Sequence, residues 1–87
     1  MIHKGSIVKS MAGRDAQRSF VVLDVQDDFA VLADGKVRPL ERPKRKKLKH
    51  LQKTNQCVDL NKDITNNKLR HTLSPWNNDR SNEEVVT

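Results

Sequence analysis

The densest group of reactive side chains is a cationic run between residues 42 and 50. Six of the eight residues from 42 to 49 are basic, and His50 follows them. So much like charge in a short segment opposes folding unless an anion lies beside it. Phosphate groups are the expected partner, and counterion release would then make affinity fall steeply with salt, with a log–log slope of roughly −4 to −5 for about five or six contacts. A solvated charge run or a nuclear-localisation-like tract are the alternative interpretations.

A second group of cations lies in the segment from Ser10 to Arg18. Gly13 permits an unusual backbone conformation, and Arg14 and Arg18 flank a turn that Asp15 can brace. The planar guanidinium fork suits bidentate contact with phosphate, and exposed loops on rigid scaffolds are frequent binding sites. The alternative is that Arg14 and Asp15 only organise the turn.

Aromatic side chains, which stack on the bases of single-stranded RNA, are scarce. They are Phe20, Phe29 and Trp76, and both phenylalanines lie in apolar segments that favour a core position. Trp76 can stack on a base, but packing of the tail against the rest of the chain is the favoured use. The scarcity favours recognition of phosphates and of the shape of folded RNA over base-specific reading.

Catalytic and metal sites are not indicated. His3, His50 and His71 lie far apart, and Cys57 has no partner at the spacing of zinc ligands. Nothing near Cys57 in the sequence would lower the pKa of its thiol. We therefore expect no enzyme activity, no metal, no cofactor and no small-molecule substrate.

Length and charge distribution also favour a small domain that binds nucleic acid. The 87 residues allow one small domain with a modest core. Residues 1–53 hold 13 Lys and Arg against 6 Asp and Glu, a net charge of +7, whereas residues 54–87 have a net charge of −1. A basic half of this kind is the usual electrostatic footprint of nucleic-acid binding. The single cysteine and the lack of a long apolar stretch predict a soluble, cytoplasmic protein that does not bind membranes.

The elements that must position these cations are short strands. Ile7 and Val8, residues 20–25 and residues 29–33 form three apolar segments rich in β-branched residues. If Asp24 points outward, the alternation within the second segment sends Val21, Leu23 and Val25 to the core face. A turn at residues 26–28 would join the second and third strands.

Asp34-Gly35 is a strong hairpin signal, because both residues tolerate the positive φ angles of a tight turn. Residues 36–40 would then form a fourth strand. Pro39 places that strand at an edge, and a bulge would let Val37 and Leu40 both face inward. Several short strands with tight turns predict a mainly-β fold, a small barrel over residues 1–52.

The end of the barrel and the tail show a different pattern. Leu48 and Leu51 have the spacing of one helical turn and are expected to close the barrel. A polar tail over residues 53–76 would contain a short helix near residues 65–73, with Thr65 as its N-cap and Ile64 and Leu69 as a hydrophobic staple. Ser74-Pro75 would end this helix, and residues 77–87 are expected to be disordered.

Four segments in this order resemble the KOW family of RNA-binding domains. They are residues 5–15 (GSIVKSMAGRD), 20–22 (FVV), 33–36 (ADGK) and 43–51 (PKRKKLKHL). The chain is most similar to the KOW domains of large-subunit ribosomal proteins of the L-fourteen-e, L-six-e and L-twenty-seven-e type and to their stand-alone bacterial relatives. The resemblance covers residues 5–52, extends weakly over residues 64–73, and departs from the usual pattern at Gln17, where these motifs carry glycine.

The resemblance implies an SH3-like barrel that binds RNA. Together with the charge pattern, it predicts a ribosomal or ribosome-associated protein that docks on folded ribosomal RNA, of the large subunit, with neighbouring ribosomal proteins as further partners. The alternatives are a protein-binding adaptor of the transcription or translation machinery that uses the same barrel, and a general DNA-binding protein. The residues expected to contact RNA are Arg14, Arg18, Lys36, Arg42, Lys44, Arg45, Lys46, Lys47, Lys49 and His50.

Overall fold

The computed structural model describes residues 1–61 and 63–77 of the chain. Its strands and helices are β1 (Ser6–Ser10), β2 (Ser19–Gln26), β3 (Phe29–Ala33), β4 (Lys44–Lys47), the 3-10 helix η1 (Leu48–His50), β5 (Leu51–Cys57) and α1 (Asn66–Asn77). No helix within the described residues is long and apolar enough to cross a membrane.

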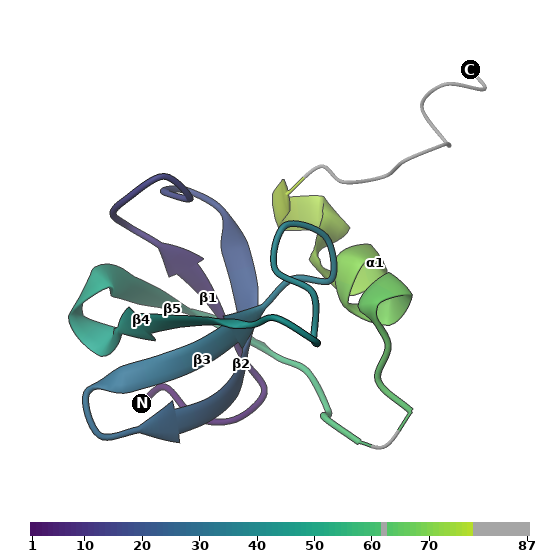
Figure 1. Ribbon diagram of the computed structural model, residues 1–87, viewed down its shortest axis with the longest axis horizontal. Coiled ribbons are helices and arrows are strands. Elements are labelled where there is room, and N and C mark those ends of the chain that lie inside the picture. The colour runs from purple at the N-terminus through teal and green to yellow at the C-terminus, as the bar shows by residue number, and fades with distance from the viewer. Residues whose placement is uncertain (62, 78–87) are drawn as a thin grey trace.

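The strands form one antiparallel sheet in the order β4-β3-β2-β1-β5 (Figure 1). β4 and β5 are therefore the outermost strands, yet only the three residues of η1 separate them in the chain. The sheet must curl until these two strands come near each other, which produces a small barrel-like domain. The predicted mainly-β class with one short helix after the strands is confirmed.

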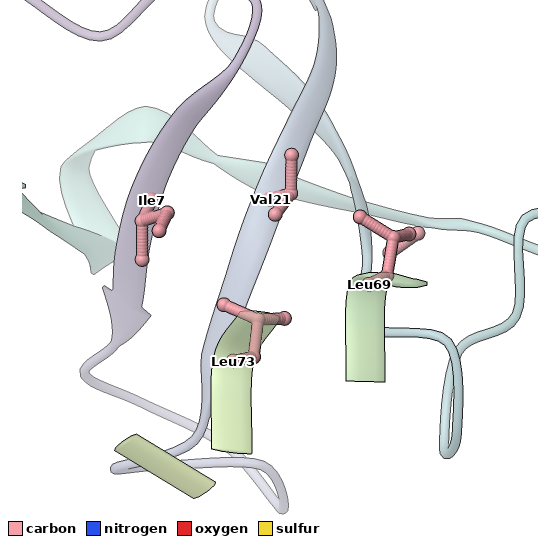
Figure 2. Close-up of a cluster of buried hydrophobic side chains, with 5 residues drawn as sticks. Ile7, Val21, Leu69 and Leu73 are labelled. Atoms are coloured by element: carbon pink, nitrogen blue, oxygen red, sulfur yellow. The ribbon is translucent and has the colours of Figure 1, made fainter. Parts of the chain in front are cut away.

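Hydrophobic side chains pack on both faces of the sheet. The interior cluster contains Val8, Phe20, Val22, Ala30 and Leu32, all fully buried. On the opposite face, Leu69 and Leu73 of α1 pack against β1, β2 and β3 (Figure 2). The helix is thus an integral part of the fold, because it covers apolar strand residues that water would otherwise contact.

A register shift in β2 corrects one detail of the expected core. The ladder between β2 and β3 shifts between Val22 and Asp24, which is the mark of a bulge. Val21 and Leu23 accordingly lie on the helix side, whereas Val25 joins the interior cluster. The prediction that Val21, Leu23 and Val25 share one face is wrong, because the extra residue reverses the alternation.

The fourth strand is not where the sequence predicted it. Asp34 Oδ1 accepts hydrogen bonds from the backbone N–H groups of Lys36 (2.9 Å) and Arg38 (2.8 Å), and this closes the chain into a compact loop. Val37 is 54% exposed, not turned inward. The segment then packs on the start of α1, where the Leu40 N–H donates to Asn66 Oδ1 at 2.8 Å. Strand β4 is formed instead by the cationic run.

The end of the barrel is partly as expected. Leu48 lies in the 3-10 turn η1, and both Leu48 and Leu51 pack against the interior cluster, as predicted. Strand β5, however, continues to Cys57, so the barrel end predicted at residue 52 falls inside a strand. Thr54 fixes this extension to the first strand, because its hydroxyl donates to the Ile7 carbonyl at 2.7 Å.

The start of α1 follows the sequence signals and its end does not. The Lys68 N–H donates to Thr65 Oγ1 at 3.1 Å, which confirms the N-cap, and Ile64 packs in the same cluster as Leu69. The helix nevertheless continues past Pro75 to Asn77. Pro75 has no N–H to offer the His71 carbonyl, and the Ser74 hydroxyl bonds to that carbonyl at 2.8 Å instead.

Asn77 is the first residue of the segment 77–87, which was expected to be disordered. It ends α1 and is anchored to β2: Ser19 N–H donates to its side-chain oxygen at 2.7 Å, and its side-chain nitrogen donates to the Ser19 carbonyl at 2.9 Å. Residue 77 is therefore ordered. The rest of the segment, residues 78–87, lies outside the described residues.

Candidate nucleic-acid interface

The pleat of β4 divides its four cations between the two faces of the sheet. Lys44 and Lys46 lie opposite Leu32 and Ala30, whose side chains belong to the barrel interior. Arg45 and Lys47 lie opposite Val31 and Phe29 and are exposed. The cationic run is therefore two pairs of charges with different surroundings.

The inward pair is held by Asp15. Lys44 Nζ lies 2.9 Å from one carboxylate oxygen of Asp15, and Lys46 Nζ lies 3.1 Å from the other. Lys46 also donates to the Ala12 carbonyl at 2.7 Å. The side chains of Asp15 and Lys46 are only 8% and 10% exposed. This buried ion triad ties the loop between β1 and β2 to the edge strand β4.

Electrostatics within the triad favour the charged carboxylate. Burial of Asp15 by itself raises its pKa, but the hydrogen bonds and positive charges of Lys44 and Lys46 outweigh that effect and lower the pKa from 3.8 to about 2. Asp15 is therefore ionised at neutral pH. Because Asp15 offsets one of the two positive charges of the inward pair, Lys44 and Lys46 have less positive charge to offer an external phosphate.

The outward pair surrounds a partly exposed aromatic ring. The Arg45 guanidinium lies 4.5 Å from the centre of the Phe29 ring, and Lys47 Nζ lies 6.0 Å from it. Phe29 is thus a half-buried platform and not the core residue that the sequence predicted; Phe20 is fully buried as predicted. Cation–π contact aligns both cations without neutralising them.

The two arginines of the loop between β1 and β2 have different surroundings. Arg18 forms an ion pair through Nε with Asp34, whose side chain is completely buried. Arg14 is exposed near the tip of the loop. Gln17 adopts a left-handed conformation with φ of 74°. The backbone at this position therefore has the conformation that a glycine would favour, although residue 17 is not a glycine.

The remaining predicted contacts lie in loops and at the barrel end. Lys36 is exposed in the loop closed by Asp34, and Arg42 is exposed two residues before β4. Lys49 is exposed on η1, whereas His50 is half-buried and its carbonyl accepts the Met11 N–H at 2.8 Å. The exposed cations between residues 42 and 49 are therefore Arg42, Arg45, Lys47 and Lys49.

A hollow of about 320 Å³, which the sequence does not indicate, lies at the other edge of the sheet. It is lined by Lys9, Gln52, Lys53, Thr54, Asn55 and Trp76. Trp76 is 39% exposed there. Lys9 and Lys53 are isolated cations in the sequence and indicate no site there. The pairing of β1 with β5 places Lys9 opposite Gln52 and Lys53 opposite Val8.

Among residues 1–61 and 63–77, no group of three or more His, Cys, Asp or Glu side chains is placed to hold a metal ion. Comparison with known proteins assigns no family: no protein-family model matches the chain, and no curated protein matches it either.

Proposed function

We propose that this protein binds folded RNA through the outward cations of β4 and η1, and that its partner is ribosomal RNA of the large subunit. The observation that carries the proposal is that two of these cations are exposed and have no carboxylate partner in the described part of the chain. Arg45 and Lys47 are exposed and aligned over Phe29, and no carboxylate in the described part of the chain forms an ion pair with either. Exposed cations held on a rigid strand suit a row of phosphates.

The choice of RNA rests on the resemblance of residues 5–52 to KOW domains and on the chemistry of the surface. Arg45 offers a planar donor fork beside an aromatic ring, which suits phosphate and sugar contacts more than base-edge reading. With Lys44 and Lys46 compensated by Asp15, the interface engages about four charges. The expected log–log salt slope is then roughly −3 to −4, shallower than a fully solvated cationic run would give.

The proposal is tested by replacing the outward pair. Arg45→Gln with Lys47→Gln should make the salt slope for a folded ribosomal RNA fragment shallower by about 2, with a corresponding loss of affinity at low salt. Lys4→Gln with Lys68→Gln is the matched control, because it removes the same charge from exposed positions away from β4. Equal losses in the two double variants would contradict a site on β4.

The same titrations separate the alternative functions. Equal affinity for duplex DNA of the same length would point to general DNA binding. Retention of ribosome association by the folded Arg45→Gln, Lys47→Gln variant would instead favour the protein-binding adaptor, since the barrel would then be held by a protein and not by phosphates.

A further inference from the structure

None of the cations of β4 lines the hollow at the edge formed by β1 and β5. Its lining combines Trp76 with the cationic residue Lys9 and the polar residues Gln52, Thr54 and Asn55. Lys53 also lines it, but this residue lies opposite the buried Val8 in the ladder, so its side chain leaves the sheet on the other face from that of Lys9. None of the described residues that line the hollow is acidic. Its volume of about 320 Å³ lies at the lower end of the range for small-ligand sites.

The position of Trp76 is fixed by the fold. α1 continues past Pro75, and the next residue after Trp76, Asn77, is bonded through its side-chain amide to both backbone groups of Ser19. Ser19 in turn lies opposite Lys9 in the ladder between β1 and β2. The anchored end of the helix thus places Trp76 with Lys9 at the hollow, and Trp76 remains 39% exposed.

From this arrangement we propose that the hollow binds one unstacked nucleotide of single-stranded RNA, with the base stacked on Trp76 and an adjoining phosphate contacted by Lys9. Every base has a π face, so an indole platform accepts any of them and needs no base-specific hydrogen bonds. A cation without an acidic neighbour among the described lining residues favours an anionic ligand. The site rests on the proposed RNA binding and adds to it a preference for bulges, loops or single-stranded ends next to the folded segment.

The protein carries its own reporter for this site, because Trp76 is the single tryptophan and there is no tyrosine. A short oligoadenylate added to the full chain should quench the indole emission saturably. The same oligonucleotide, labelled and followed by anisotropy, should bind with the same midpoint. Trp76→Leu should weaken its binding about 5- to 150-fold, the range for loss of one base–aromatic stack, and Trp76→Phe should retain most of it.

Two further variants separate the proposed nucleotide site at Trp76 from the proposed RNA binding by the outward cations of β4 and η1. Lys9→Gln should make the salt slope for oligoadenylate shallower by about 0.7 and leave binding of a hairpin without unpaired bases unchanged. Arg45→Gln with Lys47→Gln should affect mainly the hairpin. Binding of oligoadenylate with unchanged indole emission would overturn the stacking site alone, as would equal affinity of Trp76→Leu and the unaltered chain. Failure of both RNAs to bind would overturn the proposed function as well.

Discussion

Replacement of Asp15 by asparagine tests the ion triad that ties the loop between β1 and β2 to β4. The lowering of the Asp15 pKa from 3.8 to about 2 corresponds to about 2 kcal/mol of folding free energy at neutral pH. Asp15→Asn should lose this amount, because it keeps the shape of the side chain but leaves Lys44 and Lys46 without their counter-charge. For a domain of this size the melting temperature should fall by about 8–16 °C.

The pH dependence of this loss follows from the direction of the pKa change. A carboxyl whose pKa is lowered on folding stabilises the protein fully above its unfolded pKa of 3.8, and this stabilisation disappears as the pH falls through about 2. The difference between the unaltered chain and Asp15→Asn should therefore be constant from pH 5 to 7, decrease below pH 4 and vanish near pH 2. Urea unfolding followed by circular dichroism at several pH values measures it.

Asp24→Asn is the matched control for Asp15→Asn. Its carboxylate is 42% exposed and lies 4.0 Å from Lys4, so the change should cost at most about 1 kcal/mol. If Asp15→Asn is no more destabilising than Asp24→Asn at pH 7, or if its cost persists undiminished at pH 2, the triad does not stabilise the fold in the way described.

Three other substitutions test how the helix and the loops are held. Gly35→Ala should destabilise the fold by about 2 kcal/mol or more, because φ is +79° and a Cβ would lie 2.1 Å from the Asn66 carbonyl oxygen; an unchanged melting temperature would contradict this packing. Asn77→Ala removes both hydrogen bonds to Ser19 and should cost about 1–3 kcal/mol in urea unfolding, with a blue or red shift of the Trp76 emission; a loss under 0.5 kcal/mol would show that the end of α1 is not anchored there. At Gln17, where φ is 74°, the Gly variant should be more stable than the Ala variant by about 1 kcal/mol, and equal stabilities would argue against a left-handed residue at this position.

Local sequence patterns predicted the elements whose stability is decided locally. The β-branched segments gave β2 and β3, and the Thr65 cap with its staple gave the start of α1. β4 was missed because a strand of lysine and arginine has no hydrophobic alternation. It is a strand because it pairs with β3 and because Asp15, 29 residues from Lys44 in the chain, forms ion pairs with both lysines of its inward face.

The sequence likewise predicted only part of the candidate site. The sequence identified the cationic run, but only the pleat shows that Arg45 and Lys47 face outward while Lys44 and Lys46 face Asp15. Arg18, which is predicted to contact RNA, forms an ion pair through Nε with the buried Asp34, and the sequence did not indicate this pair. The hollow at Trp76 depends on the pairing of β1 with β5 and on a helix that passes a proline, and neither is visible in a local window.

The central claim, docking on ribosomal RNA of the large subunit through outward cations, is tested most directly by sedimentation. The tagged full chain is followed through a sucrose gradient of cell lysate at low and at high salt, beside the Arg45→Gln, Lys47→Gln variant. The unaltered chain should sediment with large subunits and intact ribosomes at low salt and be removed by high salt, and the variant should be removed at lower salt. A chain that remains at the top of the gradient under both conditions would contradict the claim.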